Sequence, residues 1–117
     1  SSIKLVANAQ AVATVTGTVA WEGVLRQKPG LIFGYPWYRD CPGIFTIASS
    51  EQCRDILSQI ADGLHVDPQS TLNFFYNFDK TTIHGYINMD IEKNTTLTPA
   101  QSAANIRNAM IQELTKI

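Results

Sequence analysis

The sequence has little net charge and lacks any long hydrophobic run. Nine Lys and Arg residues oppose ten Asp and Glu residues, which gives a formal net charge of −1. Proteins that bind nucleic acids carry basic stripes, and proteins that bind anionic membranes carry basic clusters. The near-neutral charge therefore argues against both kinds of partner. No apolar stretch approaches the roughly 20 residues that span a bilayer. We therefore expect no membrane insertion by this domain.

The motifs of catalytic and metal sites are also lacking. The two histidines, His65 and His84, stand alone, and no HExxH, GxSxG, paired CxxC or phosphate-loop pattern occurs. The Asp residues are scattered near predicted turns, where Asp commonly caps or solvates the chain. We expect no metal, no cofactor and no enzymatic activity. A small secreted hydrolase or inhibitor, whose carboxylates meet only in three dimensions, is an alternative.

The sequence has only two cysteines, Cys41 and Cys53. A disulfide between them would close a loop of about a dozen residues and contribute roughly 3 kcal/mol in the chain-entropy model. The alternative is two buried free thiols. We predict the disulfide, and with it an oxidising compartment: the periplasm, a virion surface or the secreted state.

What is present suits one folded domain. The chain has 117 residues, of which 44% are hydrophobic, enough to bury a core. We predict a single domain over residues 1–117, and a monomer.

The N-terminal part alternates in the manner of a β-strand. Over 11–21, Val15, Val19 and Trp21 share one face, which we expect to point inward. The other face carries Thr14, Thr16 and Thr18. Residues 26–47 then contain many prolines and glycines and predict a long loop.

Two helices and two further strands are predicted in the rest of the chain. The first helix is capped by Ser49 and ends near Gly63, and the last begins at Thr98 and Pro99. Between them, strands over 72–78 and 83–91 are joined by a hairpin at 79–82, with Phe75 or Tyr76 partly exposed. The order is strand, long loop, helix, strand, strand, helix. This predicts an α+β fold with an antiparallel sheet and two helices packed on one face.

Two candidate binding surfaces follow from the sequence. Four of the eleven aromatic residues lie within 33–38, and Arg39 follows them directly. These are Phe33, Tyr35, Trp37 and Tyr38. Aromatic rings with Arg are typical interface anchors, although the same rings can instead complete the core under a long loop. The second candidate is the sheet edge carrying Thr14, Thr16 and Thr18, which could accept an added strand or could pair internally.

One modification motif is present. Asn94-Thr95-Thr96 matches the N-glycosylation acceptor pattern, in a polar loop before the last predicted helix. The motif matters only where the source glycosylates its proteins.

The stretch from Gln52 to Glu113 resembles the helix–hairpin–helix half of SEA-type ferredoxin-like domains. The resemblance rests on a helix that ends in Gly63-Leu64-His65-Val66-Asp67-Pro68, a hairpin, and a Ser/Ala-rich helix. The predicted turn reads Asp79-Lys80-Thr81-Thr82 in place of the Gly-Ser cleavage site of SEA domains. The resemblance thus implies a structural extracellular module of a larger secreted protein, without autoproteolysis.

As a whole the chain also resembles the N-terminal domains of filamentous-phage minor coat (adsorption) proteins. The points in common are the start at Ser1-Ser2-Ile3, the loop between Cys41 and Cys53, and the aromatic segment. Such domains bind the host periplasmic protein TolA during viral entry. This resemblance implies a non-catalytic recognition module whose partner is the C-terminal domain of TolA. From the residues themselves we expect binding by strand addition at the sheet edge, aided by the aromatic segment.

Overall fold

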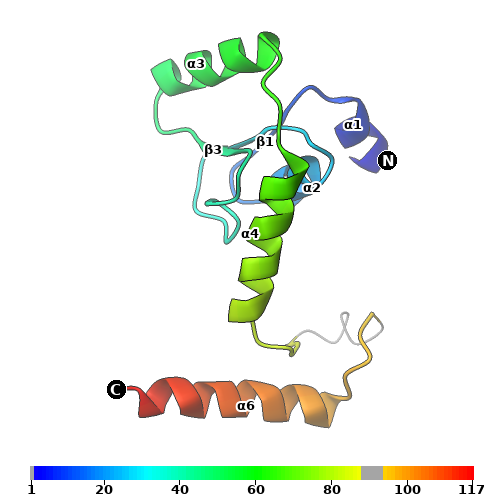
Figure 1. The fold of residues 1–117 in the computed structure, drawn as a ribbon, viewed down its shortest axis with the longest axis vertical. Helices are drawn as coiled ribbons and strands as arrows, with labels where there is room; N and C mark the ends of the chain where they lie inside the picture. The colour runs from blue at the N-terminus through cyan, green and yellow to red at the C-terminus, as the bar shows by residue number, and fades with distance from the viewer. Residues whose placement is uncertain (1, 88–93) are drawn as a thin grey trace. The chain divides into compact units, whose positions relative to one another are not determined.

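The computed structural model describes residues 2–87 and 94–117 (Figure 1). By contact density the chain divides into two compact units, residues 1–77 (unit 1) and residues 78–117 (unit 2). Helices take about 50% of the chain and strands 8%, which fits an α+β class. The described elements are α1 (Ser2–Asn8), β1 (Val12–Thr14), α2 (Val19–Val24), β2 (Gly30–Ile32), β3 (Ile44–Thr46), α3 (Ser50–Ala61), α4 (Pro68–Thr81) and α6 (Pro99–Thr115).

The sheet of unit 1 is parallel, so the predicted antiparallel sheet is wrong. Its three strands are ordered β1-β2-β3, and Leu31 at the centre lies opposite Ala13 and Phe45. Parallel strands need a crossover between them instead of a tight hairpin turn. Helix α2 supplies the first crossover, and the aromatic segment at 33–43 supplies the second. Residues 26–47, predicted as a long loop, therefore contain β2, β3 and the connection between them.

The strand predicted over 11–21 ends after three residues. The Thr14 hydroxyl accepts a hydrogen bond from the Gly17 backbone N–H at 3.1 Å, and this local bond turns the chain out of β1. The chain then enters α2, which contacts all three strands. Val15, expected to point inward, is exposed. The alternation of β-branched residues thus predicts too long a strand, because hydrogen bonds between side chains and the backbone compete with those between strands.

The core of unit 1 lies between α2, the sheet and the aromatic segment. One buried cluster consists of Ala20, Ile32 and Tyr38, and the Tyr38 hydroxyl donates a hydrogen bond to the Gly17 carbonyl. A second cluster consists of Val24, Cys41 and Val66. The aromatic segment therefore contributes directly to the core through Tyr38 and Cys41.

The predicted helix after Ser49 is confirmed as α3. The Ser49 hydroxyl accepts a hydrogen bond from the Gln52 N–H at 3.2 Å. The Gln52 side chain reaches one residue further back than in the usual capping box and accepts from the Ala48 N–H at 2.9 Å. Gly63 follows the helix with φ of 93°, the left-handed conformation that favours glycine.

Helix α4 replaces the predicted strand at 72–78 and the hairpin at 79–82. The Asp67 carboxylate accepts hydrogen bonds from the N–H groups of Gln69 and Ser70 at 3.2 and 3.0 Å, which caps the helix start. Thr71, Phe74 and Phe78, spaced three and four apart, are among its least exposed residues. Residues 83–87 are irregular, and 88–91 of the second predicted strand lie outside the described residues. The hairpin that carried the SEA resemblance is therefore absent.

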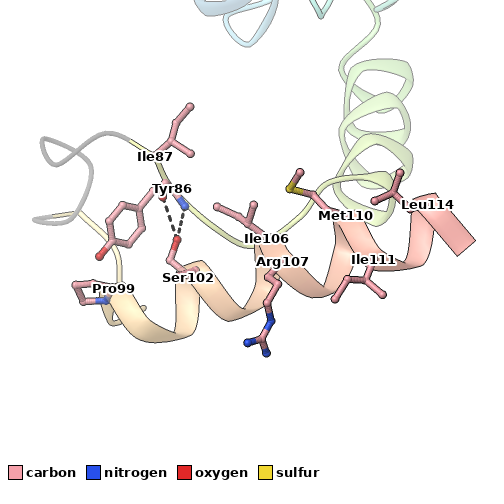
Figure 2. Close-up of a pocket in the computed structure, with 10 residues that line it drawn as sticks. Tyr86, Ile87, Pro99, Ser102, Ile106, Arg107, Met110, Ile111 and Leu114 are labelled. Atoms are coloured by element: carbon pink, nitrogen blue, oxygen red, sulfur yellow. Dashed lines mark hydrogen bonds between the residues drawn. The ribbon is translucent and has the colours of Figure 1, made fainter.

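Unit 2 is organised around α6, whose predicted start at Thr98 and Pro99 is confirmed and which carries a capping box. Thr98 Oγ1 accepts from the Gln101 N–H at 3.2 Å, and Gln101 Oε1 accepts from the Thr98 N–H at 2.9 Å. The segment at 84–86 is bonded to α6 through Ser102 and Asn105. Ser102 Oγ bonds both the N–H and the carbonyl of Tyr86, at 2.7 and 3.0 Å (Figure 2). Asn105 Nδ2 donates to the His84 carbonyl at 2.7 Å.

Candidate recognition surface

The aromatic segment of unit 1 is divided between core and surface. Tyr38 is fully buried, whereas Phe33 and Trp37 each expose 49% of their surface and Tyr35 exposes 82%. Tyr38 therefore completes the core, whereas Phe33, Tyr35 and Trp37 remain at the surface. Because Trp37 is next to Tyr38 in the chain, the exposed rings are attached to a fixed point in the core.

Trp21 lies at the centre of an aromatic group that we call the Trp21 cluster. Its ring centroid lies 5.1 Å from that of Trp37 in an edge-on arrangement, and 6.2 Å from that of Tyr38. From α4, Phe74 and Phe75 approach it at 6.4 and 6.1 Å. These separations and tilts are those that aromatic pairs favour. The cluster thus joins α2, the aromatic segment and α4.

Trp37 is the half-exposed member of this cluster that is held from two sides. Its ring packs edge-on against Trp21 and also against Tyr38, at 5.4 Å and 89°. Phe75, stacked on Trp21 at 25°, also exposes about half of its surface, at 49%. Two large rings are therefore presented to solvent in fixed orientations.

Arg39 lies over the most exposed ring of the segment. Its guanidinium carbon is 5.5 Å from the centroid of the Tyr35 ring, within the range of a cation–π contact. The same side chain is 3.6 Å from the Asp40 carboxylate. Both partners of this ion pair are exposed, so it contributes little to stability. The cation–π contact holds the Arg39 and Tyr35 side chains together at the surface.

The predicted threonine face does not form one strand edge. Thr14 lies in β1, while Thr16 and Thr18 follow the strand and are exposed. β1 is an edge strand of the sheet, but only three residues long. The structure therefore does not bring these threonines into the row that strand addition would require.

The predicted disulfide is not formed in the structure, where Cys41 and Cys53 are free thiols. Cys41 is buried, and its burial raises the pKa of the thiol to about 11. Cys53, on α3, is partly exposed. It lines a groove of about 610 Å³ together with Phe33, Ile47 and Arg54. The second cysteine is thus placed beside the exposed part of the aromatic segment.

Unit 2 carries a separate apolar groove, of about 640 Å³, along α6. Figure 2 shows Ile106, Met110 and Leu114 on the side of α6 that faces the segment of Tyr86 and Ile87. Met110 and Leu114 are largely exposed, as is Ile87. Within unit 2, much of this apolar side of α6 is therefore left uncovered.

The other titratable groups add little chemistry to these surfaces. The pKa of Asp67 is lowered, first by its hydrogen bond from the Ser70 hydroxyl at 2.6 Å, and this carboxylate caps α4. Among the described residues, no group of three or more His, Cys, Asp or Glu residues could hold a metal ion. No helix in the same described ranges combines the length and apolarity needed to cross a bilayer.

Sequence reasoning missed the contribution of α2 and α4 to the aromatic surface. Trp21 and Phe75 were assigned to strands, where they could not be placed together. Phe75 and Tyr76 are both exposed, so the expectation of exposure at one of them was correct, although its structural basis was wrong. The signal for α4 was present in Asp67-Pro68, a capping residue followed by a first-turn proline.

Comparison with known proteins found no matching protein-family model, curated protein or solved structure.

Proposed function

We propose that this chain is a non-catalytic recognition module that binds a protein partner through the exposed rings around Trp37. The observation that carries the proposal is the double packing of Trp37 against Trp21 and Tyr38, with half of its surface left in solvent. Trp, Tyr and Arg are the residues most enriched among binding hot spots. All three are present here, in Trp37, Tyr35 and Arg39.

Preorganisation is the physical reason why such a surface favours binding. Immobilising a flexible side chain on association costs roughly 0.5–1.5 kcal/mol. Trp37 is already fixed between two rings, and Tyr38 secures the segment through its buried ring and its bond to Gly17. The partner would therefore desolvate a large apolar area without ordering these groups.

The rings support binding better than the sheet edge does. An added strand gains affinity from a row of backbone hydrogen bonds, and β1 and β3 are each three residues long. The proposed contact is therefore between side chains. The C-terminal domain of TolA, named by the phage resemblance, is the first defined partner to test.

The Trp37→Ala variant tests the proposal. We expect titration of the purified C-terminal domain of TolA to give saturable binding, weakened at least tenfold by W37A, since hot-spot truncations cost about 2 kcal/mol or more. Leu57→Ala is the matched control, because Leu57 is a similarly exposed apolar residue outside the Trp21 cluster. Circular dichroism would establish that each variant is folded.

If TolA does not bind, that partner is excluded and the surface is tested more generally. The wild type, W37A and L57A proteins would each be used as bait in a periplasmic extract, and any retained protein would then be purified and titrated. A partner that requires Trp37 but not Leu57 supports the proposal. Identical sets of retained proteins for all three baits would contradict it.

A structural module within a longer protein is the second candidate, and the α6 groove is the observation that favours it. Met110 and Leu114 expose apolar surface that a neighbouring domain could cover. A purely structural module has no use for exposed rings, so this alternative predicts a fully buried aromatic segment. The exposure of Tyr35 and Trp37 disagrees with it. It would gain support if Leu114→Asp, with W37A as the comparison, abolished association with adjoining domains.

A further inference from the structure

We propose that Asn94 is an acceptor for an N-linked glycan, a modification site that goes beyond the recognition function. Of the seven asparagines in the sequence, Asn94 alone is followed two positions later by Ser or Thr. The structure adds what the motif by itself lacks: Asn94 lies in a turn and is exposed, as is Thr96. A glycan is bulky and polar, so an exposed turn can carry it without displacing packed side chains.

Among the hydrogen bonds between described residues, none uses the side chain of Asn94 or of Thr96. Thr95 Oγ1 accepts from the Leu97 N–H at 3.2 Å, which shapes the turn without using Thr96. The cap of α6 is formed by Thr98 and Gln101. Within residues 94–101, the bonds that shape the turn and the helix start therefore come from Thr95, Thr98 and Gln101.

The chemistry requires a donor of one class, an oligosaccharide linked to a polyprenyl pyrophosphate. The side-chain Nδ2 of Asn94 forms a bond to C1 of the first sugar, and the C1–O bond to the pyrophosphate breaks. The amide loses one proton, and the polyprenyl pyrophosphate leaves with the bonding electron pair. The hydroxyl of Thr96, two residues on, completes the acceptor pattern.

The position also suits a bulky polar group. Asn94 lies five residues before Pro99, the first residue of α6, and belongs to unit 2. Attachment at Asn94 replaces one hydrogen of an exposed amide, so the fold need not change. We therefore expect the modified and unmodified chains to have the same circular dichroism spectrum.

The test is translocation of the full chain into microsomes that contain oligosaccharyltransferase and its lipid-linked donor. We expect one glycan-sized mass increase that a peptide N-glycosidase removes. The variants N94Q and T96A should lose it completely. T96S should retain it because the hydroxyl is kept, and T95A should retain it because Asn94 and Thr96 are unchanged.

A reference glycoprotein in the same reaction shows that transfer is active. The proposal is overturned if the reference is modified and the wild-type chain is not. It is also overturned if N94Q carries the same glycan as the wild type. Protease protection of the translocated chain excludes failed entry as the reason for an unmodified product.

Discussion

The two cysteines are chemically unlike, because one is buried and the other lines a groove. Burial raises the pKa of Cys41 from its usual 9.0 to about 11, since the thiolate is poorly solvated among Val24 and Val66. The thiolate is the reactive form, so Cys41 should react slowly at neutral pH. Cys53 is partly exposed on α3 and does not share this protection.

We predict that iodoacetamide at pH 8 modifies Cys53 in the folded protein and modifies Cys41 only after denaturation. Peptide mass spectrometry after digestion would measure both. The raised pKa of Cys41 in the folded state also makes the stability of the fold depend on pH. The unfolded chain loses the thiol proton first, so the contribution of Cys41 to the free energy of unfolding is complete below pH 9 and is lost between pH 9 and about 11. If neither cysteine reacts until a reductant is added, the disulfide predicted from the sequence exists in solution.

At the scale of elements, a buried hydroxyl is one of the two side-chain groups that bond α6 to the segment at 84–86. Ser102 is 2% exposed and bonds both backbone groups of Tyr86. We predict that Ser102→Ala lowers the free energy of unfolding of unit 2 by about 1–3 kcal/mol, because the backbone groups lose a buried partner. Urea unfolding followed by hydrogen exchange in α6 would measure it. Exposed Ser58→Ala on α3 is the control, and an equal effect of the two substitutions would contradict the prediction.

Elements with their own capping signals were predictable from sequence, and elements defined by pairing were not. The caps at Ser49 and Thr98 use side chains within four residues of the helix start, so local sequence suffices. The strands at 72–78 and 83–91 were inferred from alternation alone. Where apolar residues occupy most positions of a segment, they fit the period of a strand and that of a helix equally well. For residues 72–78, the capping residue Asp67 was the local signal that indicated a helix.

At the scale of the whole molecule, the division into two units has a measurable consequence. Ile32 is fully buried at the centre of the sheet in unit 1. We predict that Ile32→Ala costs about 2–5 kcal/mol, reduces hydrogen-exchange protection in β1, β2, β3 and α2, and leaves the protection of α6 unchanged. Leu57→Ala, at an exposed site, is the control. Equal loss of protection in both units would instead indicate one cooperative domain over residues 1–117.

The candidate surface was predictable only in part. The sequence drew attention to the aromatic segment and Arg39, because four rings lie within six positions. It did not indicate that Trp21 and Phe75, separated by more than fifty residues, stack on one another. Such a contact depends on how α2 and α4 pack, and no local pattern encodes that packing.

The near-neutral charge, the helix starts at Ser49 and Thr98 and the single glycosylation motif can all be read from local sequence, because each is set by composition or by neighbours within one turn. The tertiary structure decided the parallel pairing of the strands, the replacement of a hairpin by α4 and the division of the aromatic segment between core and surface. Those features depend on contacts between residues far apart in the chain, where the burial of Tyr38 and the register of β2 against both neighbours decide the outcome.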